Sequence, residues 1–112
     1  MEEEIPRKPY EVSDQFDAHS AEVYQYTFDT FGFLQAERYR QKIRSAVLSL
    51  SERYLSYPEC RHIPTKSRMY RNIVLDAHLI IYRITRERIE VLDIIHGAMS
   101  VSKIRSARKI RL

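Results

Sequence analysis

The residues of this chain best suited to acid–base chemistry on a phosphate are one histidine and two arginines. His96 follows an apolar run typical of a strand, and an imidazole titrates near neutral pH, so it could act as a general acid or base. Arg71 and Arg83 stand in neighbouring strand-like segments and could supply positive charge. Lys66 could add a further charge and Tyr82 a hydroxyl. Acid–base chemistry on a phosphate group needs this combination, so His96, Arg71 and Arg83 form the candidate catalytic set.

Each of these residues also has a structural interpretation. A histidine at the end of a strand often caps backbone groups, and arginines commonly form weak surface ion pairs. The four histidines show no metal-ligand spacing and Cys60 is the only cysteine, so we expect no metal site, no cofactor and no disulfide. The sequence also lacks a Gly-rich phosphate loop, a Ser-His-Asp order and paired carboxylates, which argues against ordinary hydrolase chemistry.

Charge is distributed unevenly along the 112 residues. Residues 1–60 carry 7 Lys/Arg against 11 Asp/Glu, whereas residues 61–112 carry 12 Lys/Arg against 4 Asp/Glu. A small domain polarised in this way presents a strongly positive surface, which attracts phosphate backbones or an acidic protein. The residues expected to contact such a partner are Lys66, Tyr70, Tyr82, Lys103, Arg105, Arg108 and Lys109.

The location expected from the sequence is the cytoplasm. No apolar run reaches the roughly 18 residues that a membrane span needs. The first four residues, Met1 to Glu4, are acidic where an export signal would be basic and then apolar. A single cysteine fits a reducing compartment. We therefore expect no membrane partner.

One domain is expected over residues 1–112, because two halves of this length would be too small to bury separate cores. Residues 1–8 are expected to be flexible. After a short strand at 9–13, apolar residues recur at helical spacing from Phe16 to Phe31 and again from Ala36 to Tyr54. Gly32 lies between the two stripes, so we predict two antiparallel helices joined as a hairpin.

The second half changes to the period of strands. Segments 69–75, 79–84 and 89–95 are rich in β-branched and aromatic residues, and short turn-like segments separate them. The predicted fold is α+β, in the order β-α-α-β-β-β, with the helical hairpin packed on a small, mainly antiparallel sheet. Residues 100–112 form a basic C-terminal tail or short helix.

The predicted strands are apolar on both faces, whereas the helical hairpin covers only one. Ile80 and Tyr82 would lie on one side of the middle strand, and Leu79 and Ile81 on the other. We therefore expect part of the second face to stay apolar and open, as a docking site. An open sheet edge could also accept a strand from a partner.

Three stretches of the sequence carry a family resemblance. They are Phe31-Gly32 followed by Gln35 to Tyr39, Tyr70-Arg71 ahead of His78 to Arg83, and Ile89-Glu90-Val91 leading into Ile94-Ile95-His96. In this order and spacing the chain resembles the RelE/ParE toxin superfamily of type II toxin–antitoxin systems, from about Tyr10 to about Lys103. The first two stretches are more similar to the ParE branch than to the RelE branch.

The resemblance implies a growth-inhibiting toxin of the kind found in plasmid stabilisation systems, held inactive by a cognate antitoxin. ParE-like members inhibit DNA gyrase without catalysis of their own, whereas RelE-like members cut mRNA on the ribosome. The chain departs from the RelE pattern at two places. It has Asp76-Ala77 where a basic residue leads into the third strand, and residues 97–100 lack the expected arginine. Losing one such charge typically costs a hundredfold or more in rate.

Three hypotheses follow. The first is a ParE-like toxin that inhibits gyrase and is neutralised by an acidic antitoxin, with the basic tail contacting that antitoxin or the target. The second is a ribosome-dependent mRNA interferase, an endoribonuclease that uses His96, Arg71 and Arg83. The third is an inactive toxin that retains antitoxin binding. A homodimer and a toxin–antitoxin hetero-oligomer are both compatible with the sequence.

Overall fold

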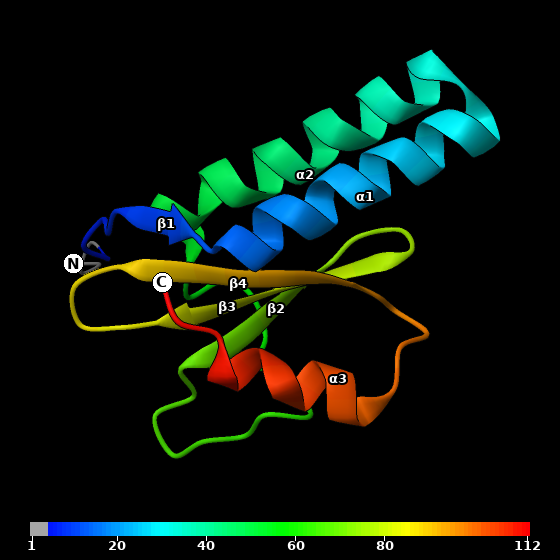
Figure 1. The fold of residues 1–112 in the computed structure, drawn as a ribbon. Helices are drawn as coiled ribbons and strands as arrows, with labels where there is room; N and C mark the ends of the chain where they lie inside the picture. The colour runs from blue at the N-terminus through cyan, green and yellow to red at the C-terminus, as the bar shows by residue number, and fades with distance from the viewer. Residues whose placement is uncertain (1–4) are drawn as a thin grey trace.

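A single four-stranded sheet organises the chain, and helical segments cover both of its faces (Figure 1). The computed structural model describes residues 5–112. The strands are β1 (Tyr10–Val12), β2 (Tyr70–Val74), β3 (His78–Ile84) and β4 (Ile89–His96), in the spatial order β1-β4-β3-β2. β1 pairs with β4 in parallel, and the other two pairs are antiparallel. The predicted α+β class, element order and mainly antiparallel sheet are confirmed.

Two long helices form the hairpin on one face, α1 (Asp14–Phe31) and α2 (Phe33–Arg53). Ser13 starts α1: its Oγ accepts a hydrogen bond from Phe16 N (2.9 Å) and donates one to Leu92 O of β4 (2.6 Å). The helix is therefore attached to the central strand at its first residue. Gly32 joins the two helices with a φ of +91°, a left-handed conformation that favours glycine.

The first core lies between the hairpin and the sheet. Leu50, Ile80 and Tyr82 at its centre are fully buried. Ile80 and Tyr82 point to this side while Ile81 points to the other, as the alternation of the middle strand predicts. The far end of the hairpin extends beyond the sheet, so Phe31, which the helical stripe places in the core, is 66% exposed.

The second face of the sheet is closed, and the expectation of an open apolar face is wrong. The loop at 58–69, helix α3 (Val101–Ser106) and the 3-10 turn η1 (Ala107–Lys109) pack against it. The buried side chains of this second core are Cys60, Ile63, Ile81, Leu92, Ile95, Ile104 and Ala107. The loop contributes its apolar residues without any regular period, so the sequence pattern does not show that they cover a sheet.

The β2 edge of the sheet is also less open than expected. Residues 58–60 run along the outer side of β2, where Cys60 N donates to Tyr70 O (2.8 Å) and Asn72 N donates to Pro58 O (3.1 Å).

Part of the expected flexible segment 1–8 falls on residues 1–4, which lie outside the described residues. Within the remainder, Lys8 Nζ donates to Thr85 O (2.6 Å). No helix within residues 5–112 has the length and apolar character needed to cross a bilayer.

Candidate functional site

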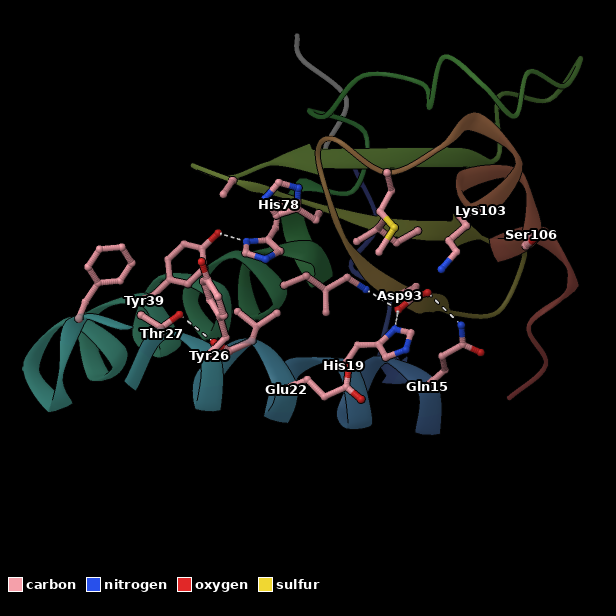
Figure 2. Close-up of a pocket in the computed structure, with 17 residues that line it drawn as sticks. Gln15, His19, Glu22, Tyr26, Thr27, Tyr39, His78, Asp93, Lys103 and Ser106 are labelled. Atoms are coloured by element: carbon pink, nitrogen blue, oxygen red, sulfur yellow. Dashed lines mark hydrogen bonds and ion pairs between the residues drawn. The ribbon is translucent and has the colours of Figure 1, made fainter. Parts of the chain in front are cut away.

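A cleft of about 1010 Å³ opens between α1, the ends of β3 and β4, and α3 (Figure 2). The hairpin forms one wall because it extends past the sheet (Figure 1), and Lys103 of α3 stands on the opposite wall (Figure 2). Histidines, a buried carboxylate and exposed apolar side chains line it together. The side chains that line it include Gln15, His19, Tyr26, Phe31, Tyr39, His78, Asp93, His96, Met99 and Lys103.

A carboxylate at the base of the cleft joins α1 to β4. Asp93 is 4% exposed, and its Oδ1 lies 2.6 Å from His19 Nδ1 and accepts from Ile94 N (2.8 Å). Its other oxygen accepts from Gln15 Nε2 (3.0 Å). Both carboxylate oxygens therefore have partners, as a buried charge requires. This arrangement positions α1 on the sheet.

A second polar group lies at the mouth of the same cleft. His78 of β3 and His96 of β4 face each other with ring centroids 5.4 Å apart, and Tyr39 Oη lies 2.6 Å from His78 Nδ1. Burial, and secondarily the nearby His96, lowers the pKa of His78 below its ordinary value. Burial also raises the pKa of Tyr39. At neutral pH His78 is therefore uncharged, and its tautomer sets which of the two groups donates the hydrogen bond between Tyr39 Oη and His78 Nδ1.

The bulge between β3 and β4 brings the two histidines together. Near the turn the pairing runs Ile84↔Ile89 to Tyr82↔Val91, and it then shifts by one residue, so that His78 lies opposite His96. Without that shift His78 would lie opposite Ile95. A one-residue slip moves every following side chain to the other face of the sheet. The histidine pair thus depends on a local irregularity of β4.

The three residues of the ribonuclease hypothesis are not assembled. Arg83 lies five residues along β3 from His78, so it is about 16 Å from His96 at the usual rise per residue. It is 9% exposed, and it donates to Glu90 Oε1 (2.7 Å) and to Ile110 O (3.1 Å). The guanidinium of Arg83 therefore holds parts of the fold together and does not point towards His96.

Arg71 also belongs to the scaffold. Its guanidinium donates to Leu55 O (3.1 Å) and Tyr57 O (2.9 Å), the carbonyls that follow α2. It therefore holds the connection after α2 against β2. His96 caps the turn after β4, because its Nδ1 accepts from Ala98 N (3.1 Å), as the structural interpretation of a strand-end histidine predicts.

Comparisons with known proteins place this fold. The family model described as the ParE toxin of the type II toxin–antitoxin system parDE matches residues 10–101. The chain belongs to the ParE toxin family. Toxin ParE1 of Mycobacterium tuberculosis, in strains CDC 1551 / Oshkosh and ATCC 25618 / H37Rv, is 29% identical over 96 residues, which are 84% of this chain and 94% of that relative.

A solved structure gives the same fold at lower identity. It is a chain from the chromosomal ParDE system of P. aeruginosa, with a TM-score of 0.67 at 16% identity, over 82% of this chain and 98% of that one. The matched family region begins with β1 and ends at the first residue of α3. This ParE-family chain is therefore a type II system toxin by family, and such a toxin has a cognate antitoxin partner.

The residues expected to contact a partner divide into two groups. Tyr82 is fully buried under the hairpin, its hydroxyl donates to Tyr54 O (2.6 Å), and burial raises its pKa, so its expected contact with a partner is wrong. Tyr70 is half-buried, and its hydroxyl accepts from Arg83 (3.3 Å). The remaining cations of the group are exposed: Lys66, Lys103, Arg105, Arg108 and Lys109.

Sequence reasoning missed most of the cleft of this ParE-family chain. Of the lining residues, only Lys103 and His96 were predicted from the sequence as site residues. Tyr39 and His78 complete the polar group around His96, and the pair of Asp93 and His19 lies at the bottom of the cleft. The position of His78 and His96 at the outer ends of one predicted hairpin was the available signal. From that hairpin the expected partner of His78 is Ile95, one residue away from His96. The bulge then shifts the pairing so that His78 and His96 lie opposite each other.

Proposed function

We propose that this chain is a ParE-like toxin that acts in the cytoplasm by inhibiting DNA gyrase and is neutralised by an acidic cognate antitoxin. The observation that favours inhibition of gyrase over cleavage of mRNA is the set of hydrogen bonds that Arg71 and Arg83 form within the protein. Both arginines bind backbone carbonyls, and Arg83 also binds Glu90, so neither is available to hold a scissile phosphate. A toxin that inhibits its target by binding needs no such group.

One observation favours the alternative of an mRNA interferase. The pair of His78 and His96 lies beside Tyr39 in a cleft whose far wall carries Lys103, which is a set of acid, base and charge different from the expected one. An inactive toxin that retains antitoxin binding needs neither set. Substitution of His78 and His96 therefore tests all three hypotheses.

The test of the target follows DNA and protein synthesis in the first minutes after tightly controlled induction. The expected result is an early stop in DNA synthesis, with inhibition of supercoiling by purified gyrase. A variant with His78→Asn and His96→Asn should keep its toxicity. An early stop in protein synthesis with cleaved mRNA, abolished in that variant, would favour the interferase, and growth without inhibition would favour the inactive toxin.

The cleft is the proposed antitoxin site. Tyr26, Phe31 and Met99 are 65%, 66% and 41% exposed and lie around the same cleft, and a group of exposed apolar side chains around one cleft is typical of an interface. Lys103 at its border offers a cation to an acidic segment. An antitoxin segment that packs apolar side chains against these walls and places a carboxylate beside Lys103 therefore suits this cleft.

Two charge substitutions separate antitoxin binding from toxicity. Phe31→Asp places a carboxylate on the wall of the cleft and should prevent rescue of growth by the co-expressed antitoxin while leaving the toxin active. Leu48→Asp is the matched control, because Leu48 is 53% exposed on α2 and does not line the cleft. Equal loss of rescue in both variants would contradict this location.

A further inference from the structure

The C-terminal side of the molecule carries a concentrated positive charge that neither the target nor the antitoxin proposal uses in full. Residues 58–69 and 102–111, here called the basic layer, cover the second face of the sheet. The layer holds Arg61, Lys66, Arg68, Lys103, Arg105, Arg108, Lys109 and Arg111. Against these eight cations stands one acid, Glu59, and all eight are exposed. Among residues 5–112, none of the eight forms an ion pair.

The surface of the basic layer has no apolar anchor. Its apolar side chains, such as Ile63, Ile104 and Ala107, are buried against the sheet. Within these bounds the described residues expose no large hydrophobic side chain, and the two that flank the second segment at its ends, Val101 and Leu112, are each 40% exposed. Protein–protein interfaces depend on buried apolar or aromatic anchors at their centre. A surface of cations without such anchors fits a phosphate backbone better than an acidic protein.

The layer also lacks the means to bind single strands. It contains no Phe, Tyr or Trp, and binding of single-stranded nucleic acid relies on bases stacked on aromatic side chains. We propose that the basic layer binds duplex DNA through its phosphate backbone, without reading the base sequence.

The cations stand on an ordered backbone. Arg83 donates to the carbonyls of Arg108 (3.4 Å) and Ile110 (3.1 Å), which attaches the end of the chain to the sheet. Arg105 Nε donates to His62 O (3.3 Å) and so connects the two segments of the layer. Because this backbone is already ordered, less conformational entropy is lost on binding.

The opposite side of the molecule carries less net positive charge than the basic layer. Helix α1 carries four acids, Asp14, Asp17, Glu22 and Asp29, and no Lys or Arg, whereas α2 beside it carries five Lys/Arg against two acids. A polyanion is therefore attracted most strongly to the basic layer. Binding of DNA by this layer is independent of the proposed target, and it is measured without gyrase or antitoxin. Failure of either proposal therefore leaves the other testable.

The experiment measures binding of the purified chain to a labelled 20-base-pair duplex by fluorescence anisotropy over a series of salt concentrations. The test variant replaces Arg108, Lys109 and Arg111 with Gln. The control variant replaces Arg38, Arg44 and Arg53 of α2 with Gln, which removes the same net charge from exposed positions in the other layer. A change in net charge alone affects the two variants equally.

Duplexes of two unrelated sequences should bind with affinities equal within about threefold, since phosphate contacts carry no sequence information. In the test variant the slope of log affinity against log salt should fall by up to about three, one for each lost phosphate contact. The control should keep the slope within about one unit. If the test variant proves unfolded by circular dichroism, Arg61→Gln with Lys66→Gln in the loop replaces it, with an expected fall of up to about two.

Four outcomes would overturn the proposal. They are absence of binding at about 50 mM salt, an equal loss in the control, tighter binding of the corresponding single strand, and tighter binding of a glutamate-rich peptide of equal charge. The last outcome would assign the basic layer to an acidic protein partner.

Discussion

The two layers that cover the sheet are built in different ways. The hairpin layer has two helices of 18 and 21 residues with regular apolar stripes, and its first helix is acidic. The layer on the other face, here called the C-terminal layer, consists of the loop at 58–69, the six-residue helix α3 and the 3-10 turn η1; it contains most of the basic layer and is strongly basic. One is held by many apolar contacts, the other by few apolar residues and the hydrogen bonds of Arg83. Stability should therefore reside in the first layer, while the second presents charge.

The largest expected effect is a cavity in the hairpin layer. Leu50→Ala removes a fully buried side chain at the centre of the first core and should lower the free energy of unfolding by about 3 kcal/mol. Ile104→Ala is the comparison in the C-terminal layer, and it should cost about 2 kcal/mol because a short surface helix can relax. Urea unfolding of both variants measures the difference. A larger loss for Ile104 would reverse the ranking of the layers.

The second effect concerns the attachment of the C-terminal layer. Burial opposes ionisation of Glu90, but hydrogen bonds from Arg83 and Arg88 outweigh it and hold the pKa of Glu90 below its ordinary value. Arg83→Met leaves Glu90 with only Arg88 and frees the carbonyls of residues 108 and 110, which should cost about 2 kcal/mol.

Hydrogen exchange locates this effect. In the Arg83→Met variant, amides of 107–111 should lose protection first, before those of α1 and α2. Arg88→Met, which removes a more exposed partner of Glu90, is the matched control and should leave that region protected. Uniform loss of protection across the chain would mean that the two layers unfold together.

The smallest effect is a pH dependence at the cleft. Because the pKa of folded His78 is lowered, the folded state binds its proton less readily than the unfolded state. Its contribution to stability is complete above the unfolded pKa, about 6.5, and is lost as pH falls from there towards the folded pKa. The stability of wild type relative to His78→Asn, measured by urea unfolding at a series of pH values, should decline over that window. A flat profile would show that His78 titrates as in the unfolded chain.

The sequence by itself determined the α+β class, the order of the elements and the hairpin layer. Stripes such as Ala36 to Tyr54 are long and regular, so local pattern and tertiary packing agree there. The three-stranded meander and the family resemblance were also available from the sequence, since strand periodicity and turn residues are local signals. The uneven distribution of charge between residues 1–60 and 61–112 also follows directly from the sequence.

Tertiary structure alone decided the closed second face and the composition of the cleft. Cys60 and Ile63 lie in a loop with no period, so only the three-dimensional arrangement shows that they cover Ile81. The arginines expected to act on a phosphate became scaffold residues because backbone carbonyls from distant segments reach them. A single bulged residue in β4 placed His96 beside His78, and such a one-residue shift leaves no mark in hydrophobic periodicity. Long-range contacts and local irregularities therefore set the site, whereas periodic local patterns set the fold.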